Sequence, residues 1–212
     1  MSASGKRPAG VDLFAGAGGM SLGFEQAGFD VAVAVEHDPV HCATHEFNFP
    51  NCAAICRSVA DIDGEYIRSH SRIGHRTVDV VFGGAPCQGF SMIGKRALDD
   101  PRNSLVHHFV RLVVELKASY FVFENVKGLT VGAHKKFLEE IMREFGKNGY
   151  GVREDYQVLN ALNHGVPQAR QRLFLMGARK GLALPGYPTA THDALREKNA
   201  AGNLFCHPTP TV

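Results

Sequence analysis

The sequence predicts an α/β domain with a mostly parallel β-sheet, helices on both faces and an antiparallel hairpin at its C-terminal end. Short apolar runs rich in β-branched residues alternate with segments of helical periodicity, which is typical of βαβ units. One such run, 78–82, is typical of a strand buried in a parallel sheet. We expect this domain to span residues 10–180, after a disordered polar tail at 1–9 and before a linker at 181–212.

Composition limits the kinds of protein that this chain can be. Its 212 residues are 44% hydrophobic and 21% charged, which suffices for one sizeable core. No apolar run is long enough to cross a bilayer, and residues 1–10 lack the apolar core of a signal peptide. Five cysteines in such a chain indicate reduced thiols in a cytoplasm. The formal charge of +2 neither proves nor excludes a nucleic-acid partner.

The chain opens with a strand at 10–14, a glycine-rich loop at 15–19 and a helix from Met20 that stops at Gly28. Glycines at such a place let a ligand approach the backbone beside a helix N-terminus. Packing in a tight turn would explain the glycines about as often. The dinucleotide-binding fingerprint is incomplete, because Ser21 stands in place of its third glycine.

A second strand covers 31–35 and ends at Glu36. A carboxylate at this strand end, about 20 residues after the glycines, is placed to bond the hydroxyls of a ribose. The arrangement therefore predicts a nucleoside cofactor that needs no pyrophosphate. Asp38 and Pro39 follow as the N-cap and first turn of a helix that continues to about Phe47.

Three histidines and a cysteine gather along this helix at the spacing of one face, namely His37, His41, His45 and Cys42. Histidines so spaced can ligate a metal ion. No pattern of supporting carboxylates accompanies them, so we expect a solvated helix face and no metal site.

Asp61 and Ile62 follow a third strand candidate that ends at 58–60. An aspartate at that place can accept a hydrogen bond from the amino group of an adenine. It can equally form the N-cap of a helix that starts near Gly64. The local sequence leaves both interpretations open.

The strand at 78–82 stops at Gly83 and Gly84, and Pro86 and Cys87 follow. The two glycines turn the chain at the carboxyl edge of the predicted sheet, where open α/β sheets bind their ligands. Pro86 restricts the backbone, so the loop presents Cys87 with little freedom. A thiol so placed is a candidate nucleophile, and the alternative is a small buried core residue.

Helical periodicity over 104–116 and 134–145 flanks a strand at 120–123, which ends at Glu124. A carboxylate directly after a buried strand is costly unless it has a function or a partner. Glu124 is therefore a candidate site residue.

The last strand candidates are 152–159 and 173–178, and a polar segment with two arginines lies between them. Arg170 and Arg172 are two residues apart, so they would point the same way in an extended segment. Guanidinium groups suit a phosphate or a base edge. The alternative is a pair of exposed surface arginines.

These motifs, in this order, resemble those of the cytosine-5 DNA methyltransferases over about residues 10–178. The combination of Pro86-Cys87-Gln88 with Glu124-Asn125-Val126 is highly specific. The matching segments are 12–19, Glu36, 61–62, 84–91, 100–105, 124–126 and 168–172.

The resemblance implies the Rossmann-like fold of methyltransferases that use S-adenosyl-L-methionine as methyl donor. It implies double-stranded DNA as substrate, with the target cytosine flipped out of the duplex. In this scheme the Cys87 thiolate attacks C6 of the cytosine, and Glu124 bonds N3 and the exocyclic amine while C5 accepts the methyl group. Arg170 and Arg172 would steady the flipped base and its phosphate.

The resemblance also implies which residues contact the ligands. The implied cofactor-binding residues are Phe14, Ala15, Gly16, Gly18, Gly19, Glu36, His37, Asp61, Ile62, Pro86 and Leu105. The implied DNA-binding residues are Gln88, Ser91, Asn125, Val126 and Gln168. His37 stands where the family often carries an aromatic residue stacked on adenine, and it offers less area for that contact.

The family continues beyond this region with a variable target-recognition domain and a C-terminal segment that completes the cofactor pocket. Residues 209–212 resemble the lead-in to that half. We therefore expect either one half of a split enzyme, completed by a second polypeptide, or a truncated chain. The expected setting is a restriction-modification system in a bacterial cytoplasm.

The sequence also allows other interpretations. A tRNA-directed relative would share the catalytic motifs, and a cofactor-binding subunit would be inactive without its partner. A nicotinamide-dependent oxidoreductase is disfavoured by Ser21 in the glycine loop. A non-enzymatic scaffold is disfavoured because Cys87, Glu124 and Arg172 are all present.

Overall fold

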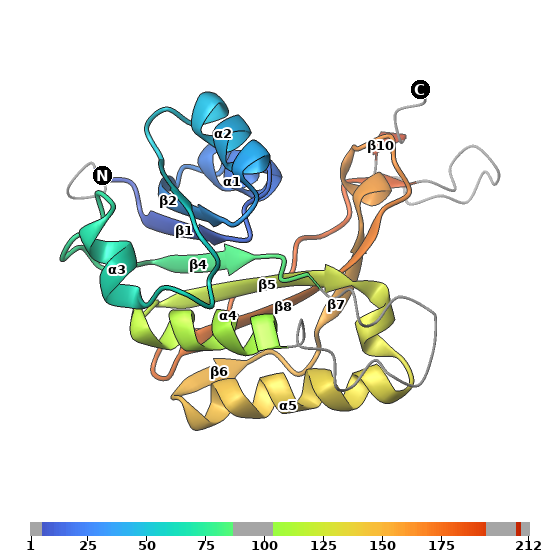
Figure 1. Ribbon diagram of the computed structural model, residues 1–212. Helices are drawn as coiled ribbons and strands as arrows, with labels where there is room; N and C mark the ends of the chain where they lie inside the picture. The colour runs from blue at the N-terminus through green and yellow to red at the C-terminus, as the bar shows by residue number, and fades with distance from the viewer. Residues whose placement is uncertain (1–5, 87–103, 194–206, 209–212) are drawn as a thin grey trace.

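The computed structural model describes residues 6–86, 104–193 and 207–208, and Figure 1 shows their arrangement. The strands of its main sheet are β1 (Ala9–Leu13), β2 (Asp30–Glu36), β3 (Ala53–Cys56), β4 (Val80–Gly83), β5 (Tyr120–Val126), β6 (Tyr150–Val152), β7 (Gln157–Asn160) and β8 (Gln171–Arg179). A short second ladder pairs β9 (His192–Asp193) with β10 (His207–Pro208).

The order of strands in the sheet is β3-β2-β1-β4-β5-β8-β6, and β7 also pairs with β8. Strands β1 to β5 are mutually parallel. In contrast, β8 runs antiparallel to β5, β6 and β7. The predicted α/β fold, with a mostly parallel sheet and an antiparallel C-terminal end, is confirmed.

Helices cover both faces of the sheet. They are α1 (Gly19–Gln26), α2 (Pro39–Asn48), α3 (Gly64–Ser69), α4 (Ser104–Glu115) and α5 (Ala133–Lys147), with 3-10 turns η3 (Lys127–Thr130) and η4 (Ala161–His164). Figure 1 shows α1 and α2 on one face and α3, α4 and α5 on the other. No helix within the described ranges is long and apolar enough to cross a bilayer.

The two layers of packing follow from the alternation of side chains along β4. Val81 points into the larger core cluster under α4 and α5. Val80 and Phe82 point into the smaller cluster, where the ring of Phe82 stacks on that of Phe24 at 3.7 Å. All four residues of β4 are buried, which confirms the prediction of a strand covered on both faces.

Local signals placed the start of α2 correctly. Asp38 is the N-cap, and its Oδ1 accepts hydrogen bonds from the backbone N–H groups of Val40 at 2.9 Å and His41 at 3.1 Å. Pro39 occupies the first helical position, where its missing N–H has no cost.

The third strand lies earlier than the sequence predicts. β3 covers Ala53–Cys56, and its pairing with β2 ends at the Glu36–Cys56 pair. Residues 58–60 instead form a turn, closed by the Asp61 N–H donating to the Ser58 carbonyl at 3.0 Å. The cap of α3 is Asp63, which accepts from the Tyr66 N–H at 2.7 Å, so Asp61 does not serve as the N-cap.

The predicted strand at 152–159 is broken in two. Val152 of β6 pairs with Gly177, whereas Gln157 of β7 pairs with Phe174, so extra residues bulge out between them. An ion pair between Arg153 and Asp155 stabilises the bulge. Alternation alone does not reveal such a break, because β6 and β7 both pair with the same strand.

The folded part of the chain also extends beyond both ends of the predicted domain at 10–180. β1 begins at Ala9, which is fully buried, and Arg7 donates to the carbonyl of Gly28 at 3.1 Å. Residues 6–9 are therefore part of the fold. Beyond residue 180, the Tyr187 hydroxyl donates to the Phe174 carbonyl at 2.8 Å, which ties the predicted linker to β8.

The close approach of β4 to β1 requires glycine at position 83. A Cβ atom on Gly83 would lie 2.0 Å from the carbonyl oxygen of Leu13. We predict that Gly83→Ala lowers the free energy of unfolding by about 2–3 kcal/mol or more, because β4 must move. In the control Gly146→Ala, a Cβ would meet nothing within 4 Å, and we expect a small gain in stability. Urea unfolding followed by circular dichroism measures both, and equal stabilities would contradict the prediction.

Candidate active site

Two cavities lie at the carboxyl edge of the parallel strands. The first has a volume of about 510 Å³ and the second of about 590 Å³. Phe14 and Gly84 contribute to the walls of both cavities. This edge is where open α/β sheets bind their ligands.

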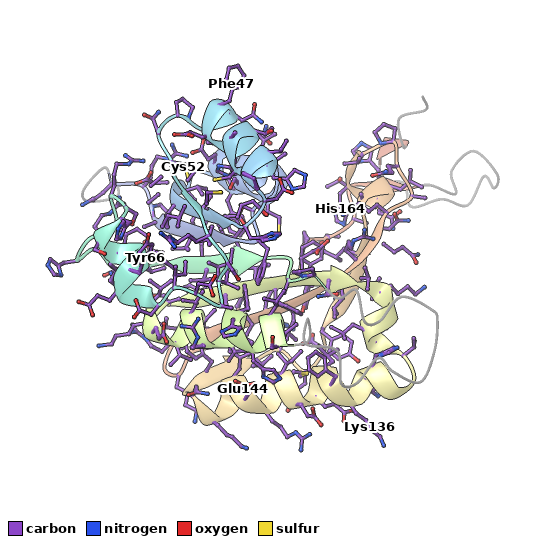
Figure 2. All side chains as sticks on the ribbon, in the orientation of Figure 1. Phe47, Cys52, Tyr66, Lys136, Glu144 and His164 are labelled. Carbon is purple, nitrogen blue, oxygen red and sulfur yellow. The ribbon has the colours of Figure 1, made fainter. Side chains whose placement is uncertain are left out.

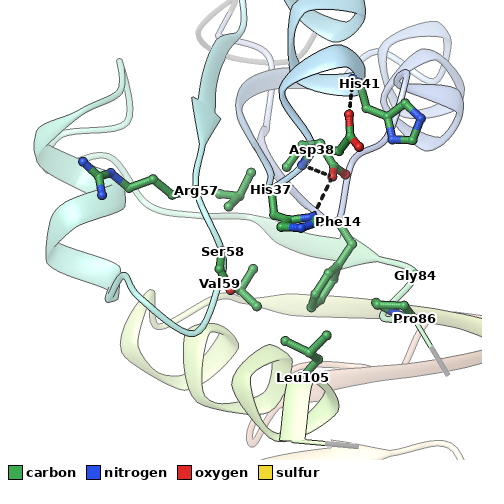
Figure 3. A pocket seen from close by; sticks show the side chains of 12 residues that line it. Phe14, His37, Asp38, His41, Arg57, Ser58, Val59, Gly84, Pro86 and Leu105 are labelled. Carbon is green, nitrogen blue, oxygen red and sulfur yellow. Dashed lines mark hydrogen bonds and ion pairs between the residues drawn. The ribbon is translucent and has the colours of Figure 1, made fainter. Parts of the chain in front are cut away.

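The first cavity is built from the ends of β1, β2 and β4, the start of α2, the loop after β3 and the start of α4 (Figure 3). It is lined by Phe14, Val35, Glu36, His37, Asp38, His41, Arg57, Ser58, Val59, Gly84, Pro86 and Leu105. Figure 3 shows the ring of Phe14 pointing towards Leu105, with Pro86 beside it. Five of the predicted cofactor-binding residues thus meet here: Phe14, Glu36, His37, Pro86 and Leu105.

Glu36 ties two sides of this cavity together. Its Oε2 accepts a hydrogen bond from the backbone N–H of Gly16 at 2.8 Å, and its Oε1 accepts from that of Asp38 at 2.8 Å. His37 Nδ1 lies 3.7 Å from the same carboxylate, on a side chain that is 79% exposed. Each carboxylate oxygen keeps a second lone pair, so Glu36 can still accept hydrogen bonds from a ligand.

The glycines of the loop at 15–19 have two different roles. Gly16 has a φ of 53°, and a Cβ on Gly16 or Gly19 would meet nothing within 4 Å, so these two positions are open to a ligand. Gly18 has a φ of 97°, and a Cβ there would lie 2.2 Å from the ring of Phe49. Gly18 is therefore required for packing within the protein.

Other predicted cofactor-binding residues do not line the first cavity. Asp61 is exposed, and Ile62 is buried in the larger core cluster, where its carbonyl accepts from Arg111 at 2.9 Å. Sequence reasoning missed seven lining residues, namely Val35, Asp38, His41, Arg57, Ser58, Val59 and Gly84. The place of Asp38 just after Glu36 was an available signal, whereas nothing local marks 57–59.

The prediction of a solvated histidine face on α2 is wrong for His45 and Cys42, which are 0% and 6% exposed. Figure 2 shows Phe47 projecting outward from α2, where it is 87% exposed, so the face of His45 is turned inward. His41 is exposed and lines the first cavity. No group of three or more His, Cys, Asp or Glu residues in the described part of the chain could hold a metal ion.

The second cavity contains the predicted base-binding residues. It is lined by Phe14, Gly19, Met20, Gly84, Glu124, Leu159, Ala161, His164, Val166, Arg170, Arg172, Phe174 and Pro188. Arg172 Nε lies 3.1 Å from Glu124 Oε1, and Arg170 Nη2 lies 3.9 Å from the same oxygen. The two arginines point the same way, as their spacing predicts. A Cβ on Gly84 would lie 2.7 Å from Glu124 Oε2, so glycine there leaves room for the carboxylate.

Burial raises the pKa of Glu124 above its ordinary value, and the opposing charges of Arg172 and Arg170 only partly offset this effect. The side chain is 19% exposed. Such a carboxyl group can take up a proton and then donate a hydrogen bond to a ligand in the cavity.

The predicted DNA-binding residues are placed differently from one another. Asn125 is 3% exposed and its Nδ2 donates to the Ala85 carbonyl at 3.0 Å, so it supports the loop after β4 and does not face a cavity. Val126 is 38% exposed, and Gln168 is also on the surface. Cys87, Gln88 and Ser91 lie outside the described residues.

The sequence matches the family of C-5 cytosine-specific DNA methylases over residues 9–206. It is 66% identical over 185 residues to the type II methyltransferase M.XorII of Xanthomonas oryzae pv. oryzae, covering 87% of this chain and 44% of that protein. It is 42% identical over 189 residues to M.AquIA of Picosynechococcus sp., covering 86% of this chain and 76% of that protein.

Solved structures agree in fold. A protein encoded in an E. coli prophage and described as a DNA modification methyltransferase matches with a TM-score of 0.72 at 34% identity, over 89% of this chain and 54% of that one. The DNMT2 protein of Spodoptera frugiperda matches with a TM-score of 0.64 at 22% identity, over 86% and 53%. The chain thus spans less than half the length of M.XorII and about half of each of these structures.

The raised pKa of Glu124 predicts how stability depends on pH. The folded protein binds the proton of the Glu124 carboxyl group more tightly than the unfolded chain does. The contribution of this proton to the stability of the fold is therefore fully present below the ordinary pKa of 4.5. It is lost as the pH rises through the pKa of the folded state. We predict that Glu124→Gln reduces the decline of the melting midpoint as the pH rises above 4.5, and that it raises the midpoint once wild-type Glu124 is ionised. The exposed control Glu139→Gln should leave the pH profile unchanged, and identical profiles for both variants would contradict the prediction.

Proposed function

Because the chain belongs to the C-5 cytosine-specific DNA methylase family, we propose that it transfers a methyl group from S-adenosyl-L-methionine to C5 of cytosine in double-stranded DNA. The observation that carries the proposal is the pair of adjoining cavities that share Phe14 and Gly84. One contains a carboxylate suited to a ribose, Glu36, and the other a buried carboxyl group suited to a base, Glu124.

The first cavity fits the cofactor. Its volume of about 510 Å³ is within the usual range for small-molecule sites. Glu36 would accept hydrogen bonds from the ribose hydroxyls, and Phe14 and Leu105 would offer apolar area to the adenine. The open backbone at Gly16 and Gly19 would accommodate the amino-acid part. When bound, the cofactor supplies a methyl group activated by its sulfonium.

The second cavity would hold the flipped cytosine. Glu124, with its raised pKa, would donate a proton or a strong hydrogen bond to N3 of the base. That contact draws electron density towards N3 and makes C6 electrophilic. Arg172 keeps the Glu124 carboxyl group oriented and would steady the base or its phosphate.

We assign the nucleophile to Cys87. It directly follows Pro86, which lines the first cavity, in the loop after β4. Its thiolate would form a bond to C6 and place an electron pair on C5. That pair would take the methyl group from the sulfonium, whose S–CH₃ bond breaks to leave S-adenosylhomocysteine. A water molecule would then take the C5 proton, which restores the double bond and expels the Cys87 thiolate.

We further propose that target recognition needs protein beyond these residues, in the form of a second polypeptide or of a longer chain. The support is the share of M.XorII that the chain covers, 44%. The formal charge of +2 also suits a part that lacks much of its DNA-binding surface. The type II relatives favour a restriction-modification setting.

The assignment of the nucleophile is tested with Cys87→Ala. In a complex completed with a polypeptide that carries a target-recognition domain, we predict that methyl transfer from tritiated cofactor to DNA falls by about 10³-fold or more, because the bond from Cys87 to C6 can no longer form. Binding of S-adenosylhomocysteine should stay within a small factor of the wild type. Cys56→Ala removes an exposed thiol and serves as the matched control with full activity. Methylation of C5 by Cys87→Ala would refute the role.

A second experiment tests the need for a recognition domain. We predict little methylation by residues 1–212 alone, because opening the duplex costs a few kcal/mol before any chemistry occurs. Activity should return when a polypeptide with a target-recognition domain is added. Robust sequence-specific methylation by residues 1–212 alone, at sub-micromolar DNA, would show that no further part is needed.

A further inference from the structure

A buried chain of polar groups joins β1, α1 and α2 behind the glycine loop. Asp12, Ser21 and His45 are 1%, 0% and 0% exposed, and they are three of the four buried polar side chains among the described residues. The Ser21 hydroxyl donates to Asp12 Oδ2 at 2.6 Å. Ser21 Oγ lies 3.0 Å from His45 Nε2.

The same region of α2 supports the loop directly. A Cβ on Gly18 would lie 3.0 Å from His45 Cδ2, so the histidine ring packs against the backbone of the loop. The side chain of Asn48 donates to the Ala17 carbonyl at 3.4 Å. The last turn of α2 therefore supports the loop from one side, while Gly16 and Gly19 are open on the other.

The two hydrogen bonds of this group are oriented from His45 through Ser21 to Asp12. Because the Ser21 hydroxyl donates to Asp12, its oxygen is free to accept a hydrogen bond from His45 Nε2–H. Burial lowers the pKa of His45, which favours the neutral ring with a single N–H. His45 Nδ1 has no hydrogen-bond partner within the described part of the chain. Among these residues Ser21 is therefore the hydrogen-bond partner of the ring, which also packs on Phe49 with 4.6 Å between the ring centroids.

Such a group of side chains is costly in a core. Burial raises the pKa of Asp12 to about 7, which shows how strongly the site disfavours the charged carboxylate. Apolar side chains of similar volume would pack here without that cost. The geometry also explains Ser21 in place of the third glycine of a dinucleotide fingerprint. That glycine serves close packing of helix on strand, and here the Ser21–Asp12 hydrogen bond holds α1 against β1.

We propose that Ser21 and His45, anchored on Asp12, are positioning residues that hold the glycine loop in the shape that binds the cofactor. They fix the first turn of α1 and the last turn of α2 on β1, which sets the backbone at Gly16 and Gly19. None of the three lines the first cavity, so they act through the loop. This inference rests on the proposed function.

The test compares Ser21→Ala, His45→Phe and the double variant in the full chain, with titration calorimetry of S-adenosylhomocysteine. Each single variant should weaken the affinity by about five- to tenfold, the effect of one buried hydrogen bond. The double variant should be little weaker than either single one, because both break the same link. Ser71→Ala is the matched control, since its hydroxyl also donates a hydrogen bond at 2.6 Å, in this case to the backbone carbonyl of Ile67. It should lower the melting midpoint without changing the affinity.

Hydrogen exchange separates positioning from general loss of stability. In Ser21→Ala, exchange should rise in peptides covering 14–22 and stay unchanged in those from α5. An affinity within twofold of wild type for both Ser21→Ala and His45→Phe, or an equal loss in Ser71→Ala, would overturn the inference. If the wild type itself binds no S-adenosylhomocysteine, the proposed function fails first and this inference with it. If Ser21→Ala does not fold, His45→Phe alone decides.

Discussion

The carboxylate of Glu36 is the contact on which the site depends. Its two oxygens accept hydrogen bonds from the backbone N–H groups of Gly16 and Asp38, each at 2.8 Å. One side chain at the end of β2 thereby fixes the glycine loop after β1 and the start of α2. Both segments lie at the carboxyl edge of the parallel sheet, so their geometry follows from strand pairing. The first cavity forms between them, with Glu36 at its wall.

The close packing of neighbouring strands creates the second half of the site. Gly83 lets β4 approach β1, and Gly84 leaves space for the carboxyl group of Glu124. Glu124 in turn is held by Arg172 from β8, the antiparallel strand beside β5. Because β8 reverses the direction of the sheet, it brings its arginine to the same edge as the carboxyl ends of the parallel strands. The second cavity thus needs both the parallel and the antiparallel part of the sheet.

Helix α2 connects the first cavity with the glycine loop. Its first turn carries Asp38 and His41 at the cavity, and its last turn places His45 behind the glycine loop. The helix is rigidly capped at one end and joined through Ser21 to β1 at the other. Buried polar groups at this junction are costly, yet they fix a unique arrangement, since only one pairing satisfies the Ser21 hydroxyl.

The sequence by itself determined the features that depend on neighbours along the chain. The start of α2 follows from Asp38 and Pro39, and the placement of Glu36 and Glu124 follows from their positions directly after the apolar runs of β2 and β5. The shared direction of Arg170 and Arg172 follows from their spacing. The sequence motifs along the chain also sufficed to predict the family, because several specific segments occur in the same order as in that family.

Only the tertiary structure decided the features that depend on distant partners. The extent of β3 is set by its pairing with β2, and the break between β6 and β7 by their common partner β8. His45 is turned into the core because Ser21, from another helix, lies there to bond it. Asn125 supports a loop because Ala85 comes close only in the folded chain. A side chain's chemistry is local, whereas its burial and partner arise from contacts between segments far apart in the sequence.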